Sequence, residues 1–268
     1  MIRSNYHVHS TYCDGKNTLE ENVQEAIRLG FTSIGFSSHS HTSFSNYGLT
    51  YENQPKYIKE ISDLKKKYAD KIEIYAGIEK DLFTDDTAGY DYVIGSVHYT
   101  KPDESCAIDN GTEVMLKNVN ENFGGDFLKY ARHYFEITTY LPLKTRCNII
   151  GHFDIVSIYN DNNIYFDENS KKYLDYALSA AEYIIKKHGC IFEMNSGAVF
   201  RGYKSSVYPS FKILKGIREL GGEIMLNTDS HKISALSFKQ DDMALLAKEA
   251  GFKYAKEIKN SEFVDTLL

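Results

Sequence analysis

The chain has 268 residues, of which 42% are hydrophobic and 25% are charged, and its formal net charge at pH 7 is -6. This composition is ordinary for a globular protein in water, and an acidic balance without a basic tract argues against a nucleic-acid partner. No apolar run approaches the roughly 20 residues of a membrane-spanning helix, and the N-terminus lacks the pattern of a secretory signal. We therefore expect a cytoplasmic protein with no membrane partner, and no obligate protein partner is evident.

Segments with the pattern of strands alternate with amphipathic segments along the chain. Strands are predicted over 6–9, 33–36, 72–78, 92–97, 148–151, 190–195 and 223–228. Helices are predicted over 19–29, 55–68, 126–140, 170–188, a segment ending at 221, and 240–250, while 100–125 is predicted as a long loop with room for a short helix. This alternation predicts a parallel α/β sheet, and seven units in a chain of this length predict one closed or nearly closed barrel domain over 1–268.

The first predicted strand carries two histidines, His7 and His9, and Asp14 follows in a turn with Gly15. Side chains two residues apart in a strand point to the same face, so the two imidazoles should lie side by side. That pairing is typical of half a metal site. The alternative for this stretch taken alone is a histidine pair on an exposed edge strand.

Further histidines and carboxylates follow the other predicted strands, at the end of a parallel barrel where active sites lie. With the first strand included, the set at these positions is His7, His9, His39, Glu79, His98, His152, Asp229 and His231. Neutral imidazoles and carboxylates are ligands of zinc, iron and manganese. With Asp14 the set has nine members, which is too many for one ion, and Glu79 is its only glutamate and so the natural bridge. Two or three divalent ions are predicted, an arrangement that favours phosphoester hydrolysis.

The motifs formed by these residues resemble, in order and spacing, those of the PHP (polymerase and histidinol phosphatase) family. The motifs are His7-Val8-His9 with Asp14-Gly15, Ser38-His39, Gly77-Ile78-Glu79, Gly95-Ser96-Val97-His98, Gly151-His152-Phe153-Asp154 and Thr228-Asp229-Ser230-His231. The resemblance is greatest to the monofunctional histidinol-phosphate phosphatase branch. The sequences that indicate this branch are Tyr12-Cys13-Asp14-Gly15 and residues 91–99. Ser38 stands where an acidic residue often precedes the second-motif histidine.

The resemblance implies a distorted seven-stranded (β/α) barrel like a TIM barrel, with a trinuclear centre of zinc, iron or manganese. By motif position, the first metal would be held by His7, His9, Glu79 and Asp229, the second by Glu79, His98 and His152, and the third by Asp14, His39 and His231. The implied activity is hydrolysis of L-histidinol phosphate to L-histidinol and phosphate in histidine biosynthesis.

Candidate substrate residues lie on the loops that follow the strands. Arg201 is the best-placed arginine for the phosphate, with Lys204 behind it, although Arg201 also fits a solvated loop charge. Asp229 and His231 are candidates for protonating the leaving group. Asp154 has three open roles: orienting a metal ligand, binding the substrate's ammonium or imidazole, or capping a helix or turn. Aromatic candidates for the imidazole are Phe44, Tyr47, Tyr99 and Tyr159.

Two other functions compete with this interpretation. The same metal centre suits a PHP phosphoesterase that acts on a nucleotide or another small phosphate ester. A member of a different class, a non-catalytic metal-binding regulatory barrel, would be expected to have lost some of the nine ligands. The complete set argues against that second alternative.

Overall fold

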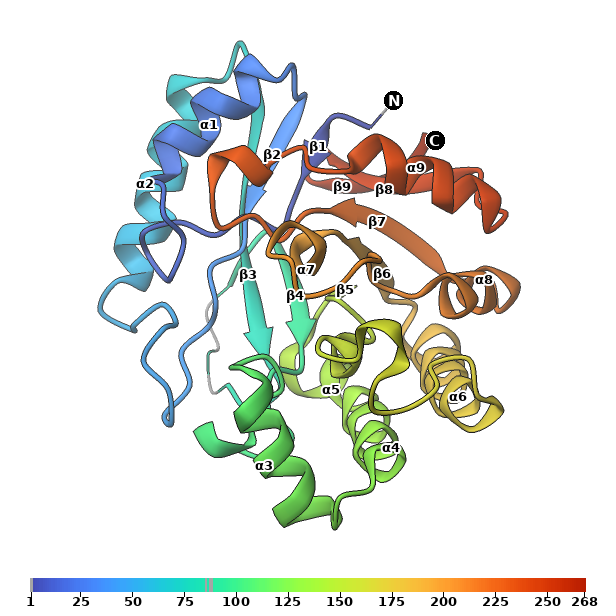
Figure 1. The fold of residues 1–268 in the computed structure, drawn as a ribbon. Helices are drawn as coiled ribbons and strands as arrows, with labels where there is room; N and C mark the ends of the chain where they lie inside the picture. Colours follow the sequence, from blue (N-terminus) through green and yellow to red (C-terminus); the bar gives the residue numbers. More distant parts are fainter. Residues whose placement is uncertain (1, 85, 87–88) are drawn as a thin grey trace.

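The computed structural model describes residues 2–84, 86 and 89–268, and its centre is a sheet of seven parallel strands (Figure 1). Each strand pairs in parallel with the next in chain order. The last strand meets the first: the His9 amide donates to the Ser230 carbonyl at 2.9 Å, and the Ser230 amide donates to the His7 carbonyl at 2.9 Å. The predicted nearly closed (β/α) barrel is confirmed. The strands are β1 (Ser4–Asn5), β2 (Ser33–Phe36), β3 (Glu73–Asp81), β4 (Tyr92–Ser96), β5 (Ile149–Ile150), β6 (Ile191–Asn195) and β7 (Glu223–Asn227).

Helices surround the barrel and bury one face each. The first begins at a capping box, in which the Thr18 side chain accepts from the Glu21 amide and the Glu21 carboxylate accepts from the Thr18 amide. None of the helices in the described part of the chain is long and apolar enough to span a membrane. The helices are α1 (Leu19–Arg28), α2 (Gln54–Lys67), α3 (Thr112–Phe123), α4 (Phe127–Thr138), α5 (Leu141–Thr145), α6 (Lys171–His188), α7 (Gly197–Phe200), α8 (Phe211–Glu219) and α9 (Gln240–Glu249).

The structure differs from the sequence prediction within the long loop at 100–125. Most of its second half is α3, a helix of 12 residues. Its buried face combines Met115 and Val119 with the polar Asn118, whose amide nitrogen donates to Thr100 Oγ1 at 3.0 Å and to the Cys106 carbonyl at 3.1 Å. Because part of the buried stripe is polar, its hydrophobic periodicity is too weak for recognition from the sequence.

A C-terminal hairpin that the sequence analysis missed closes the opposite end of the barrel. Its strands are β8 (Tyr254–Lys259) and β9 (Glu262–Leu267), joined at Asn260 and Ser261 with φ of 51° and 65°. Two consecutive residues with positive φ are typical of the tight turns that suit hairpins. The hairpin packs on the barrel floor, where the Ile258 amide donates to the Tyr6 hydroxyl oxygen at 2.8 Å.

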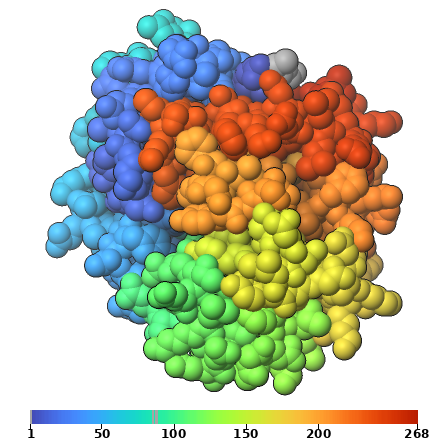
Figure 2. Space-filling view, in the orientation of Figure 1, coloured from blue at the N-terminus to red at the C-terminus, as the bar shows by residue number. Residues whose placement is uncertain are grey.

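The first strand ends before its predicted position at 6–9. Regular pairing covers only Ser4–Asn5, and the chain then continues through His7 and His9 with a single parallel bridge between Val8 and Ser230. The two histidines therefore lie beyond the strand, at the end of the barrel where the carboxyl ends of the strands meet. In Figure 2 the loops from the green, yellow and orange parts of the chain adjoin one another on the viewed face.

Candidate metal centre

The barrel brings all nine predicted ligands to one end of the molecule. Glu79 lies within β3, and the others follow strand ends or the first turn of the chain. Three groups have ligand atoms within 4.8 Å of one another: His9, Asp14, His39 and His231; His7, His9 and Glu79; and His39, Glu79 and His98. His152 joins the centre through Glu79, and Asp229 joins it through His9.

Glu79 occupies the middle of the group, and its two carboxylate oxygens face different imidazoles. Oε2 lies 3.2 Å from His7 Nε2 and 2.8 Å from His39 Nδ1. Oε1 lies 2.9 Å from His152 Nε2 and 3.3 Å from His98 Nε2. Ligands at 2.0–2.1 Å from a tetrahedral ion are about 3.4 Å apart, so these separations suit ions placed on both sides of the carboxylate.

Asp229 and Asp14 bound the other side of the centre. Asp229 Oδ1 lies 3.2 Å from His9 Nε2, and Asp14 Oδ2 lies 3.2 Å from His231 Nε2. The Asp229 backbone has φ of 50°, a left-handed conformation that is uncommon for a residue with a side chain. Backbone strain of this kind clusters at functional sites, because the surrounding structure has to hold it in place.

Several buried polar atoms of the centre lack a hydrogen-bond partner among the described residues. They are His7 Nε2, His9 Nε2, Asp14 Oδ1, Glu79 Oε2, His98 Nδ1 and His152 Nδ1. Buried polar groups in native proteins are nearly always paired, so a concentration of unpaired ones indicates something that the protein binds. Imidazole nitrogens and carboxylate oxygens suit divalent metal ions, and the residues therefore fit such a group.

The charges of the centre are those expected of a cation site. Burial by itself raises the pKa of Glu79, but the imidazoles of His7 and His39 outweigh it and hold that pKa well below its usual range. Burial lowers the pKa of His7, but Glu193 and Glu79 raise it well above the ordinary value. A proton on His7 thus balances the neighbouring carboxylates, and a bound cation would take its place because ligands must be deprotonated.

Glu193 on β6 is a functional residue that the sequence analysis missed. Its side chain is fully buried, and its Oε1 lies 2.6 Å from His7 Nδ1 and 3.0 Å from Asn227 Nδ2. Its Oε2 accepts from the His152 amide at 2.9 Å and from Asn195 Nδ2 at 2.8 Å. A carboxylate on Nδ1 fixes the ring orientation and leaves Nε2 for a metal. The available signal was a glutamate inside an otherwise apolar buried strand.

Asp81 holds a second histidine in a similar way. Its Oδ2 accepts from the His98 amide at 3.0 Å and lies 3.4 Å from His98 Nδ1. On the neighbouring strand, the Ser96 hydroxyl donates to Glu79 Oε1 at 2.6 Å. The ligands are therefore supported by a layer of hydrogen bonds from β3, β4 and β6.

Arg201, the predicted phosphate contact, lies beside the centre and not out in solvent. Its Nη2 donates to Asp229 Oδ2 at 2.9 Å, and its Nη1 lies 3.4 Å from His231 Nδ1. Its side chain keeps 29% of its exposure, so one side of the guanidinium is open. Gly197 makes room for this pair, because a Cβ there would come within 2.8 Å of Asp229 Oδ2. Arg201 is thus exposed as a residue but paired with Asp229, and its contact with the phosphate stays a prediction.

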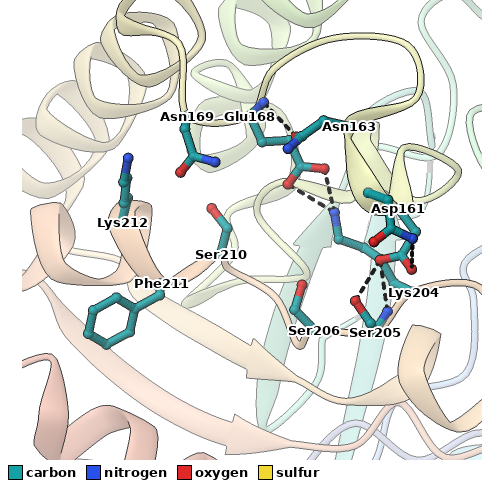
Figure 3. A pocket seen from close by; sticks show the side chains of 11 residues that line it. Asp161, Asn163, Glu168, Asn169, Lys204, Ser205, Ser206, Ser210, Phe211 and Lys212 are labelled. Carbon is teal, nitrogen blue, oxygen red and sulfur yellow. Dashed lines mark hydrogen bonds and ion pairs between the residues drawn. The ribbon is translucent and has the colours of Figure 1, made fainter.

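Lys204 and Asp154, the other two predicted substrate residues, lie in a separate buried group. The Lys204 ammonium donates to Glu168 Oε1 at 2.8 Å (Figure 3). It also donates to Ser157 Oγ at 2.9 Å. Asp154 Oδ2 accepts from the Ser210 amide at 2.9 Å, and its side chain caps no helix. Burial raises the pKa of Asp154 to about 6, against the lowering effect of Lys204. Their substrate contacts stay predictions, since protein groups already engage both side chains.

The fold and site together define a class: parallel (β/α) barrels with a cluster of histidines and carboxylates that could hold metal ions at the carboxyl ends of the strands. The PHP domain family model matches residues 5–197, and the chain belongs to this family. It is 29% identical to a probable histidinol-phosphatase of Schizosaccharomyces pombe, over 84% of this chain and 79% of that one. It is also 29% identical to the histidinol-phosphatase of Lactococcus lactis, over 94% of this chain and 93% of that one.

A solved structure extends these similarities to three dimensions. It is the crystal structure of histidinol phosphate phosphatase from Lactococcus lactis in complex with zinc, L-histidinol and phosphate. The TM-score is 0.75 with 26% sequence identity, and the alignment covers 97% of this chain and 98% of that one. The likeness therefore extends over nearly the whole of both chains.

Proposed function

We propose that the chain is a histidinol-phosphatase that hydrolyses L-histidinol phosphate to L-histidinol and phosphate. The observation that carries this proposal is Glu79, whose two oxygens face separate sets of imidazoles at the end of the barrel. The proposal is also supported by the Lactococcus lactis protein, which binds zinc, L-histidinol and phosphate and whose fold aligns with this one over nearly the whole of both chains. We also propose that residues 1–268 act as one domain, since the C-terminal hairpin packs on the barrel floor.

The metal set follows from the ligand positions. We infer two to three divalent ions of zinc, manganese or iron, with Glu79 shared between the first two. The inferred groups are His7, His9, Glu79 and Asp229; Glu79, His98 and His152; and Asp14, His39 and His231. When bound, such ions would supply a water of lowered pKa and neutralise the charge of the phosphate.

The chain's own residues would bind and orient the phosphate ester. Arg201 offers the open side of its guanidinium beside Asp229, and a planar fork of N–H donors suits phosphate oxygens. Burial raises the pKa of Asp229, but Arg201 and His7 hold it well below the usual range, so this carboxylate stays ionised. Asp229 and His231 remain the residues predicted to protonate the leaving oxygen, and both lie next to Arg201. As an ionised carboxylate, Asp229 could only pass on a proton that it had first accepted.

Phosphate release from L-histidinol phosphate, beside a panel of nucleotides and sugar phosphates, tests the proposal. The protein should have its metal content counted before the assay. A kcat/KM for L-histidinol phosphate far above the panel is the expected result. A preference for nucleotides would favour the other phosphoesterase, and no turnover above the metal-stripped protein would favour the non-catalytic barrel.

A further inference from the structure

Asp109 lies at the metal centre but belongs to none of the groups described above. The residue before it, Ile108, donates its amide to the carbonyl of His98 at 2.8 Å. The Asp109 carbonyl accepts from the Tyr159 hydroxyl at 2.6 Å, and the same hydroxyl oxygen accepts from the Gly111 amide at 2.7 Å. Hydrogen bonds at Ile108 and at the Asp109 carbonyl therefore fix the backbone of Asp109. Its neighbour Ile108 is bonded directly to the backbone of His98, a predicted metal ligand.

The carboxylate of Asp109 is half-buried, yet it forms no hydrogen bond or ion pair with any residue in the described part of the chain. It is close enough to influence groups of the centre. Burial lowers the pKa of Arg201, while Asp229 and then Asp109 raise it. Burial also lowers the pKa of His98, and Glu79, with a contribution from Asp109, raises it. The Asp109 carboxylate is therefore within electrostatic reach of both His98 and Arg201.

Three tyrosines lie near Asp109. Burial and then the neighbouring Tyr99 raise the pKa of Tyr47 well above its ordinary value, and Asp109 acts in the same direction. The Tyr47 ring centroid lies 4.8 Å from that of His39, so this phenol reaches the metal centre. The third phenol, Tyr159, bonds to the Asp109 backbone. Phenol faces beside a carboxylate attract an organic cation, through the ring quadrupole and through the negative charge.

Loops from distant parts of the chain meet here. The antiparallel bridge between Tyr99 and Ala107 holds the segment after β4 against the loop that leads to Asp109. Tyr159 and Tyr203 contact each other edge to face at 5.7 Å, which joins the loops after β5 and β6. Figure 2 shows the green and yellow segments in contact with the orange one on this face.

The proposed substrate carries a cation in a position that fits. In L-histidinol phosphate the primary ammonium group is on the carbon next to the CH₂–O–P unit, only two carbons from the ester oxygen. With the phosphate at the metal centre and at Arg201, the ammonium must lie just outside them. We propose that Asp109, framed by Tyr47, Tyr99 and Tyr159, is the subsite for this ammonium and selects amine-bearing phosphate esters. This inference rests on the proposed function for the identity of the ester.

The two other buried acids near the strand ends do not serve this purpose. Asp154 is fully enclosed, with the Ser210 amide on one oxygen and Lys204 nearby. Glu193 is fully enclosed by His7 and by backbone and amide donors. Asp109 differs from both because it is only half-buried and its carboxylate forms no hydrogen bond or ion pair with the described residues.

Three esters and one substitution test the subsite on the full-length, metal-loaded protein. The esters are L-histidinol phosphate, phosphoethanolamine, which has its ammonium in the same position, and ethyl phosphate, which has none. In Asp109→Asn we expect kcat/KM for the two amine esters to fall by about 10- to 100-fold, the loss of one hydrogen bond to a charged group, mainly through KM. The value for ethyl phosphate should stay unchanged. Calorimetry should show the Kd of L-histidinol rising by a similar factor.

Glu104→Gln is the matched control, because it removes an exposed carboxylate from the same loop, and all values should stay at those of the unsubstituted protein. An equal loss on all three esters in Asp109→Asn would overturn the subsite and make Asp109 a support of the metal centre. Unchanged binding of L-histidinol would overturn it as well. A third outcome separates the two proposals. If the unsubstituted protein does not hydrolyse L-histidinol phosphate but hydrolyses phosphoethanolamine faster than ethyl phosphate, and Asp109→Asn removes that preference, the proposed function fails and the subsite stands.

Discussion

Two groups of buried charged side chains lie at the same end of this barrel, and they differ in how their charges are satisfied. In the metal centre, six side-chain atoms of the predicted ligands have no hydrogen-bond partner among the described residues. In the second group, Lys204 is bonded to both oxygens of Glu168 and to Ser157, and these three residues are here called the Lys204 cluster. Asp154, nearby, keeps one oxygen, Oδ1, without a hydrogen-bond partner among the described residues. Both groups are rich in charge, so burial of charge by itself does not identify a site. Unpaired ligand atoms indicate a place for something from outside, whereas a completed set of bonds indicates a structural role.

The difference predicts opposite results when one member of each group is removed. In Glu79→Ala we expect the loss of at least two metal ions and of turnover by more than about 10³-fold, above the 10²–10³ of a single preorganised contact. The barrel should remain folded, because the lost carboxylate held ligands together rather than the core. Metal counting by mass spectrometry and circular dichroism measure the two parts. Full metal content in this variant would remove Glu79 as the bridge.

Lys204→Met should have the opposite effect: it should lower stability and leave metal content and turnover nearly unchanged. It leaves Glu168 as a charge without its partner, and breaking a buried ion pair costs about 3–5 kcal/mol of unfolding free energy. The Lys204 side chain is 2% exposed and that of Glu168 is 13% exposed, so solvent screens the pair little. Urea unfolding measures the loss, and the double variant with Glu168→Gln should recover part of it. A large fall in kcat/KM with normal stability would instead assign Lys204 to the substrate, as the sequence analysis predicted.

Arg201 shares a feature with each group. It has an ion-pair partner, Asp229, as Lys204 has Glu168, and one side of its guanidinium is open to a ligand. We expect Arg201→Met to lower kcat/KM for phosphate esters by about 10²-fold, the scale of one transition-state contact. Metal content should change less than in Glu79→Ala. Steady-state kinetics on the metal-counted variant decide the question, and an unchanged kcat/KM would leave Arg201 with only its contact to Asp229.

Glu193 combines features of both groups. Its carboxylate has a complete set of hydrogen bonds, and one of them holds His7 of the metal centre. Glu193→Gln keeps the shape but weakens the hold on His7, so metal affinity should fall by about 10- to 100-fold. Competition with a chelator measures this affinity. Glu257→Gln is the control, since it changes a buried carboxylate at the other end of the barrel, bonded to Ser4 at 2.7 Å. Equal effects in the two variants would indicate general destabilisation.

The metal centre could be predicted from the sequence because each ligand is next to a strand with a clear local pattern. Parallel strands place their carboxyl ends together, so residues such as His39 and His98 could be assigned to one site without knowledge of any distance. The same reasoning predicted seven strands, although it misplaced the first one. It allowed only a short helix where α3 lies and missed the C-terminal hairpin, because their patterns are weakened by a buried Asn118 and by exposed polar positions.

The sequence by itself determined the order of the strands, the residues at their ends and the family to which the chain belongs. Only the tertiary structure decided which charged side chains are already paired. It enclosed Lys204 with Glu168, placed Glu193 behind His7 and left Asp109 open. The physical reason is range: strand pattern and turn chemistry depend on neighbours along the chain, whereas the pairing of a buried charge depends on residues that the fold brings together from far apart.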